Sequence, residues 1–163
     1  MPLPDLSSAL QSFQRALDAR EIRLQKGTLD PELFMHLDSP NGESRMTYVR
    51  VEKRRVTSMV QLIHAEPYEG ETCFAVGWAV PEDLRGQGRA GQTFLAAVKE
   101  VRHGFTPHGL TAFWVEAVVG VDNTASQRVA ERVISAPVKT SVDAVAGAPI
   151  IQYLRRIDAL TVL

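Results

Sequence analysis

The stretch between residues 71 and 135 constrains the fold most, because two apolar segments alternate there with two helical patterns. Residues 71–80 and 110–119 are apolar on both faces of an extended chain, as is typical of central strands. Between them, apolar residues recur at helical spacing, which predicts a helix over 88–102, and a second helix is predicted over 124–133. A strand, a helix and a strand in this order form a parallel right-handed crossover.

A glycine-rich loop, PEDLRGQGRAG at positions 81–91, connects the first of these strands to the first helix. Gly86 and Gly88 let the backbone approach a ligand closely. The free N–H groups and the positive dipole end of the following helix form an anion site, to which Arg85 and Arg89 add positive charge. The loop therefore predicts a diphosphate ligand. The alternative is a plain glycine-rich turn with two solvated arginines.

One class of diphosphate site fits the loop only weakly. Gly86-x-Gly88-x-x-Gly91 matches the dinucleotide fingerprint G-x-G-x-x-G. That fingerprint needs the strand to run almost straight into the first glycine, whereas residues 81–85 intervene here. It also needs an acidic residue that closes the next strand, and Glu116 lies in the middle of it. A dinucleotide-binding protein remains a minor alternative.

Two motifs resemble the GNAT superfamily of acyl-CoA N-acyltransferases. Arg85-x-x-Gly88-x-Ala90 is similar to the (Gln/Arg)-x-x-Gly-x-(Gly/Ala) signature of that superfamily. The segment FWVEAVVGVDNTASQRVAER, at 113–132, looks like the second strand–helix block of the branch that contains ribosomal-protein N-terminal acetyltransferases. In that branch an Asn is followed three residues later by Ser, as in the later part of this segment. Together the two blocks cover about residues 71–135.

The resemblance implies an α/β fold: a mixed, mainly antiparallel sheet, splayed between two parallel central strands and flanked by helices. It also implies acetyl-CoA as co-substrate, with its pantetheine arm between the splayed strands and a backbone N–H there to stabilise an oxyanion. The residues that it assigns to CoA are the loop residues Arg85, Gly86, Gln87, Gly88, Arg89 and Ala90, the strand residues Trp78 and Val80, and, near the pantetheine and sulfur, Asn123 and Ser126.

The catalytic groups are less clearly marked. Many members of the superfamily use a Tyr where Ala130 stands, and a Glu on the strand over 71–80, where positions 73–80 hold no acid. The amine must still lose a proton, and Glu71, Glu116 and His64 are the candidate bases; for each, the alternative is an ordinary structural or solvated side chain.

Ser126 is the candidate proton donor to the departing thiolate. The alternative is that it merely caps its helix by bonding to the backbone. The single cysteine, Cys73, has no His or basic neighbour in the sequence and is expected to be a buried apolar residue rather than a nucleophile.

The flanking segments complete the predicted fold. A helix is expected over 5–25, with Gly27 as its stop, and a short helix over 30–37; the strand that usually opens the superfamily's fold is not visible. Strands over 46–52 and 56–65 should form antiparallel hairpins with the strand over 71–80. Two more strands are expected over 136–142 and 149–157.

Composition excludes several other classes. The chain has 163 residues, which suggests a single domain over 1–163. The net charge of -1 does not favour binding to nucleic acid or to a membrane surface. One Cys excludes an internal disulfide and favours a reducing compartment, the cytoplasm. The four His and the Cys show no metal-ligand spacing, so no metal is predicted.

The expected function is acyl transfer, most simply of acetyl, from acetyl-CoA to a primary amine by direct attack. The amine could belong to a small molecule or to a peptide, and a homodimer is compatible with the sequence. The competing class is a non-catalytic CoA-binding module, which the missing Tyr and Glu motivate.

Overall fold

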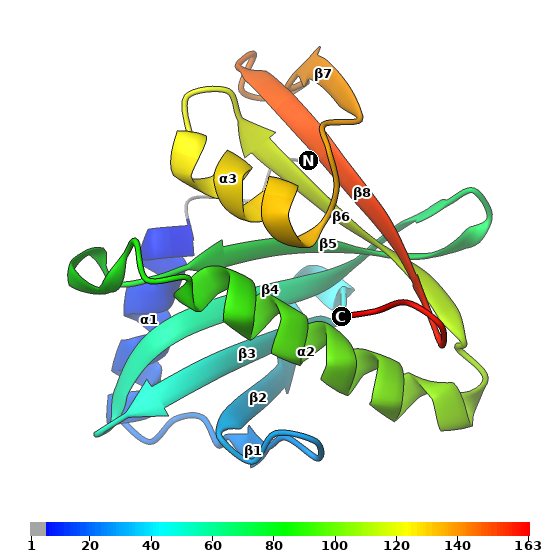
Figure 1. Cartoon of the computed structure of the whole chain (residues 1–163). Coiled ribbons are helices and arrows are strands. Elements are labelled where there is room, and N and C mark those ends of the chain that lie inside the picture. Colours follow the sequence, from blue (N-terminus) through cyan, green and yellow to red (C-terminus); the bar gives the residue numbers. More distant parts are fainter. Residues whose placement is uncertain (1–5) are drawn as a thin grey trace.

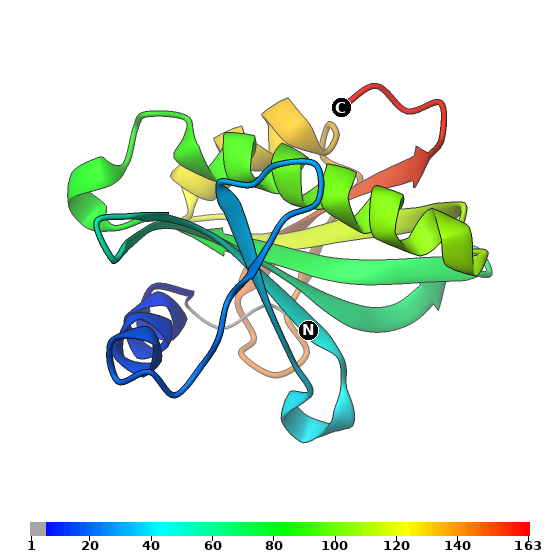
Figure 2. The same cartoon turned by 90° about the horizontal axis from the view of Figure 1, so that it is seen from below.

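A computed structural model describes residues 6–163 of the chain. Its described strands form one sheet in the order β1-β2-β3-β4-β5-β6-β8-β7, in which neighbours are antiparallel except for the parallel pair β5 and β6 (Figure 1). Helices α2 and α3 cover one face of the sheet and α1 covers the other (Figure 2). The predicted fold class, a mixed and mainly antiparallel sheet with flanking helices, is confirmed.

The central crossover agrees closely with the sequence pattern, and so do the strands on either side of it. The elements are α1 (Leu6–Asp18), β1 (Gln25–Lys26), β2 (Leu33–Asp38), β3 (Arg45–Glu52), β4 (Arg55–Tyr68), β5 (Glu71–Ala79), α2 (Arg89–Phe105), β6 (Ala112–Gly120), α3 (Thr124–Val133), β7 (Lys139–Val142) and β8 (Pro149–Asp158). No helix within residues 6–163 is long and apolar enough to cross a membrane.

The N-terminal helix is shorter than predicted. It ends at Asp18 rather than near residue 25, and Arg20 follows in the left-handed region, with φ 59°, which turns the chain away. Position 5, where the helix was predicted to begin, lies outside the described residues. Gly27 is not a helix stop. A Cβ there would lie 2.4 Å from the Asp30 carbonyl oxygen, so Gly27 permits a tight loop instead.

The short helix predicted over 30–37 is wrong, because residues 33–38 form strand β2. This strand pairs antiparallel with β3, with Leu33 opposite Arg50. Leu33 is buried on the α2 side, whereas Phe34 packs on the α1 side, so the two faces are used as in a strand. The opening strand that the sequence did not reveal is therefore present, after the helix rather than before it.

Two cores hold the helices to the sheet. On one face, α2 packs mainly on β4 and also on β2, β3 and β5, and α3 packs on β6, through residues such as Phe94, Val98 and Val133. On the other face, α1 packs Leu6, Leu10 and neighbouring apolar residues against β3, β4 and the end of β5. Burial of apolar area is the main stabilising term in such contacts. Both cores meet the end of β5, where the sheet opens.

Candidate active site

The sheet opens between its two parallel strands. β5 and β6 pair at Cys73–Trp114, Phe74–Val115 and Ala75–Glu116, and past these positions the strands separate. A cleft of about 600 Å³ occupies the separation. It is lined by residues from both faces of the sheet, by the glycine loop and by α3. The splay that the resemblance implied is therefore present, at the carboxyl end of β5.

The glycine loop borders this cleft and adopts a conformation that needs glycine. Gly86 and Gly88 have φ 75° and 76°, a region that residues with a Cβ rarely adopt. Gly88 is the residue before the first turn of α2, and within residues 6–163 no side chain caps that turn. The first N–H groups of α2 are therefore free for an anionic ligand.

The structure brings most of the predicted donor-binding residues together. The exception is Gln87, which does not line the cleft. Its side chain accepts a hydrogen bond from Arg89 Nε at 3.2 Å. Those that line the cleft are Trp78, Val80, Arg85, Gly86, Gly88, Arg89, Ala90, Asn123 and Ser126.

Both loop arginines already have protein partners. Arg85 Nε donates to the carbonyl oxygen of Val80 at 3.0 Å, and its Nη2 lies 3.4 Å from Ser7 Oγ on α1. Arg89 Nη1 lies 3.4 Å from Glu52 Oε1. These contacts tie the loop to β5, α1 and β3, so the two guanidinium groups hold the shape of the loop.

The start of α3 separates the roles of two residues that were expected to act together. Asn123 caps the helix, since its Oδ1 accepts the Ser126 N–H at 3.1 Å. The Ser126 hydroxyl accepts a hydrogen bond from Trp78 Nε1 at 3.3 Å. The interpretation of Ser126 as the helix cap is therefore wrong, because Asn123 makes that bond and Ser126 Oγ bonds to a side chain of β5.

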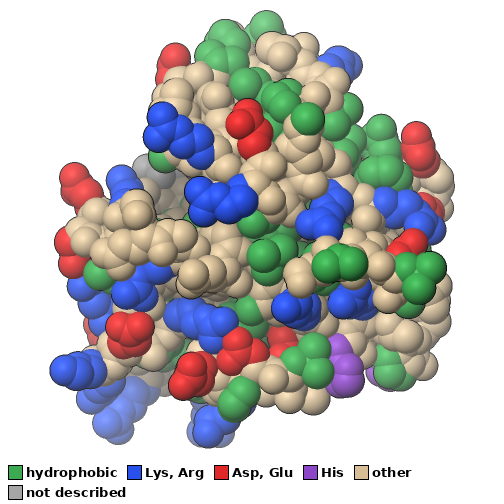
Figure 3. Space-filling view, in the orientation of Figure 1, with side chains coloured by type: hydrophobic (Ala, Val, Ile, Leu, Met, Phe, Trp, Pro, Cys, Tyr) green, Lys and Arg blue, Asp and Glu red, His purple; other side chains and the backbone are tan. Residues whose placement is uncertain are grey.

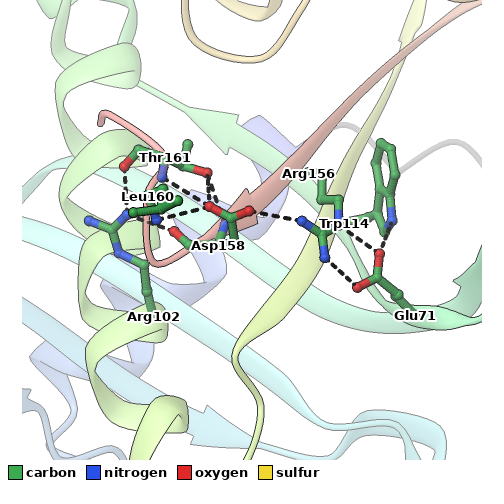
Figure 4. A network of polar contacts seen from close by, with 7 residues as sticks. All are labelled: Glu71, Arg102, Trp114, Arg156, Asp158, Leu160 and Thr161. Atoms are coloured by element: carbon green, nitrogen blue, oxygen red, sulfur yellow. Dashed lines mark hydrogen bonds and ion pairs between the residues drawn. The ribbon is translucent and has the colours of Figure 1, made fainter.

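Two of the candidate bases lie away from the cleft. Glu71 begins β5, at the end opposite the cleft, and its oxygens accept from Arg156 Nε at 2.7 Å and Arg156 Nη2 at 2.9 Å (Figure 4). The hydrogen bond from Arg156, its charge and a further bond from Trp114 keep the pKa of Glu71 below its usual range. His64 is exposed and packs its ring edge-on to Phe74. Glu71 is thus an ion-pair partner at the far end of the strand.

Glu116 lies beside the cleft without lining it. It is in the last residue pair before β5 and β6 separate, and its Oε2 accepts from Gln152 Nε2 at 2.5 Å. Its neighbours Val115 and Ala117 point into the core under α2 and α3, so Glu116 lies on the opposite face of the sheet. Burial of Cys73 raises the pKa of its thiol to about 11, and the nearby charge of Glu116 adds to this effect.

Sequence reasoning missed the contributions of α1 and of the later part of α3. Leu6 and Ser7 of α1 line the cleft, as do Arg128 and Arg132 of α3. The α1 contact depends on how a distant segment packs, which no local pattern reveals. The two arginines had a usable signal, because residues four apart share a helix face and Asn123–Ser126 had already placed α3 at the site.

No group of three or more His, Cys, Asp or Glu side chains among residues 6–163 is placed to hold a metal ion.

The cleft combines a polar, positively charged end with an apolar middle. Backbone N–H groups and guanidinium groups lie at the loop end, and apolar side chains such as Val76, Ala117 and Val119 lie between the strands. This arrangement suits a ligand with a phosphorylated head and a long, weakly polar arm.

Neither a scan of protein-family models nor a search of curated proteins matched the sequence. Solved structures do match the fold. A ribosomal-protein alpha-N-acetyltransferase, RimL, in complex with coenzyme A is 21% identical with a TM-score of 0.52, over 71% of this chain and 63% of that one. A ribosomal-protein alanine acetyltransferase from Vibrio fischeri is 12% identical with a TM-score of 0.55, over 75% and 66%.

A spermidine N-acetyltransferase chimera from Vibrio cholerae and hSSAT is 16% identical with a TM-score of 0.50, over 71% of this chain and 67% of that one. The chain thus matches a little less than two thirds of the length of the RimL structure with coenzyme A. Identities this low establish shape rather than activity. The chain has the fold of the GNAT acetyltransferases.

Proposed function

We propose that residues 1–163 form one acyltransferase domain, which transfers an acyl group, most simply acetyl, from acetyl-CoA to a primary amine in the cytoplasm. The observation that carries this proposal is the cleft between two parallel strands with an uncapped helix start and a glycine loop at its mouth. The single, buried Cys73 is in keeping with a reducing compartment.

The residues of the cleft fit the donor. The diphosphate would lie against the N–H groups of Gly86–Ala90, where a helix dipole favours negative charge. The pantetheine arm would lie between the strands beside Trp78 and Val80. Past Ala75 no described strand pairs with this edge of β5, so its backbone groups are free to bond the arm and to stabilise an oxyanion.

Ser126 is suited to protonate or hydrogen-bond the departing thiolate. Its oxygen accepts the Trp78 Nε1–H, so the hydroxyl hydrogen remains free to be donated into the cleft. Ala130 of α3, where many superfamily members have Tyr, is fully buried, so a tyrosine side chain would not fit there. In this proposal Ser126 takes the place of that donor.

The amine would approach from the α1 side of the sheet. The cleft is lined on that side by Leu6, Ser7, Gly77 and Val118 as well as by residues of the α2 side, so it reaches both faces. Glu116 lies on the α1-facing side at the point where the strands separate, and in this proposal it takes up the proton of the amine. The amine then attacks the thioester carbonyl directly.

The identity of the amine is the open part of this proposal. The names of the similar structures include acetyltransferases of ribosomal-protein N-termini and of spermidine. The Asn123–Ser126 block resembles the first group, which slightly favours a protein α-amine over a polyamine, an amino acid or an aminoglycoside.

The test is binding and turnover measured on the same protein. Acetyl-CoA at about a hundred times its Kd should stabilise the fold by about 2.7 kcal/mol, and NAD should not. Release of free CoA thiol should depend on an amine from a panel of peptides, polyamines and amino acids. Glu116→Gln should lower kcat while leaving acetyl-CoA affinity unchanged.

Each outcome assigns a function. CoA binding without turnover for any amine would make the chain a non-catalytic CoA-binding module. Stabilisation by NAD and not by acetyl-CoA would overturn the acyltransferase proposal. Gly88→Val, which introduces a branched side chain at a φ of 76°, should abolish CoA binding if the loop holds the diphosphate.

A further inference from the structure

Among the described residues, four arginines line the cleft, and they differ in what they contact. Arg85 and Arg89 come from the glycine loop and are engaged with Val80, Ser7, Glu52 and Gln87. Arg128 and Arg132 come from α3, and neither makes a hydrogen bond or an ion pair with any residue in 6–163. The arginines of the cleft that have no hydrogen-bond or ion-pair partner within residues 6–163 therefore lie on α3 rather than on the glycine loop.

The two helix arginines form one wall of the cleft. They are four residues apart, so their side chains share one face of α3. Arg132 reaches towards the loop, since its Nη1 lies 3.9 Å from the position that a Cβ on Gly88 would occupy. Figure 3 shows basic side chains over α3 at its border with α2.

Such a pair is unfavourable without a counter-charge. Like charges one helical turn apart repel each other, and both side chains are exposed rather than paired. A bound phosphate would relieve this repulsion and would accept the paired, planar N–H donors of a guanidinium group. The cleft thus has fixed N–H donors on the loop side and free cations on the α3 side.

We propose that Arg128 and Arg132 are the residues that neutralise the phosphates of the donor, and that they give the cleft its preference for a phosphorylated donor over a bare pantetheine thioester. Arg85 and Arg89 are positioning residues that shape the loop. This inference rests on the proposed function, because the ligand is CoA. The phosphates concerned are the diphosphate and the ribose 3′-phosphate, which share the same recognition chemistry.

The experiment is calorimetric titration of Arg128→Gln, Arg132→Gln and the double variant with CoA, dephospho-CoA and pantetheine. Arg23→Gln, an exposed arginine outside the cleft, is the matched control. The double variant should bind CoA about tenfold or more weakly, as expected for loss of charge-assisted bonds. The loss should shrink at high salt, and pantetheine binding should not change.

The ligand series also identifies the phosphate. A loss seen with CoA but not with dephospho-CoA assigns the arginines to the 3′-phosphate, and a loss seen with both assigns them to the diphosphate; either result supports the inference. An unchanged CoA affinity in the double variant, or an equal loss for pantetheine, overturns it. Failure of the wild-type protein to bind CoA would instead overturn the proposed function on which the inference rests.

Discussion

The indole Nε1 of Trp78 donates a hydrogen bond to the hydroxyl of Ser126 at 3.3 Å, which joins β5 to α3 across the cleft. Both residues line the cleft. The bond fixes the Ser126 oxygen as an acceptor and leaves its hydrogen for a ligand. The side-chain oxygen of Asn123, three residues earlier, accepts the backbone N–H of Ser126 instead. The two polar residues at the start of α3 should therefore respond differently to substitution.

Ser126→Ala should lower kcat, because a proton donor that acts in the transition state is typically worth about 10²–10⁴-fold. Its effect on the melting temperature should be small, since the cap of α3 does not depend on its hydroxyl. Steady-state kinetics with acetyl-CoA and the active amine, together with a thermal melt, measure both quantities. A fully active Ser126→Ala protein would remove this residue from the mechanism.

Asn123→Ala is the matched variant for that experiment. It should cost about 1 kcal/mol of stability, because it removes the side chain that caps α3. Its effect on kcat should be much smaller than that of Ser126→Ala. A variant that is as stable as wild type would contradict the capping role.

Glu100 of α2 should be important for stability. This carboxylate is buried and accepts three backbone N–H groups, from Thr28 at 2.9 Å, Leu29 at 2.7 Å and Asp30 at 2.9 Å. Glu100→Gln places an NH₂ against an N–H donor, and should cost about 1–3 kcal/mol. Urea unfolding measures the change, with exposed Lys99→Gln on the same helix as control. Equal midpoints for the two variants would contradict this role.

Stability should fall in acid through the network at the far end of β5 (Figure 4). The pKa of Glu71 is lowered by Arg156, and the pKa of Asp158 is lowered by bonds from Leu160 and Thr161 and by the charge of Arg156. Groups with a lowered folded pKa stabilise the protein above their ordinary pKa. That contribution is lost as the pH falls through the lowered values.

Glu71→Gln tests this dependence. The variant should be less stable than wild type at about pH 7, and the difference should be smaller at about pH 3, because Glu71 takes up its proton as the pH falls through its lowered pKa. Urea midpoints at the two pH values give the comparison. Glu66→Gln, which changes an exposed carboxylate on β4, serves as control. A constant difference between wild type and Glu71→Gln at both pH values would contradict the linkage.

Cys73 should be unreactive in the folded protein. It is 2% exposed, and burial, together with the charge of Glu116, raises the pKa of its thiol to about 11. Only the thiolate is nucleophilic, so alkylation at neutral pH should be slow until denaturant is added. The rate of iodoacetamide labelling, with and without guanidinium, measures this. Rapid labelling of the native protein would show an accessible thiolate.

The central part of the fold could be predicted because its signals are local. Residues 71–80 and 110–119 carry apolar side chains on both faces, which describes a strand buried between two layers wherever it lies. The glycines at 86 and 88 mark the left-handed backbone that the structure contains. The loop, the two strands and the start of α3 therefore followed from short windows of sequence.

The parts that failed depend on distant partners. Pro31 after Asp30 is a good helix start, but pairing with β3 makes the following residues a strand. The contacts of the two loop arginines were also out of reach of the sequence. Whether Arg89 is free depends on Glu52, and whether Arg85 is free depends on Ser7, which are brought close only by the folded sheet.

The short contact between β5 and β6 also has a consequence for how the chain folds. These strands share three residue pairs, whereas β6 and β8 share nine. Strands β2 to β5 follow one another as neighbours in the sheet, so their contacts are local and close quickly. Pairing β6 with β5 closes a longer loop, which contains α2, and only three residue pairs form in return. We expect the pairing of β5 with β6 to form last. Pulse-labelled hydrogen exchange should find the amides within 73–75 and 114–116 that bond between these two strands protected after the amides that pair β3 with β4.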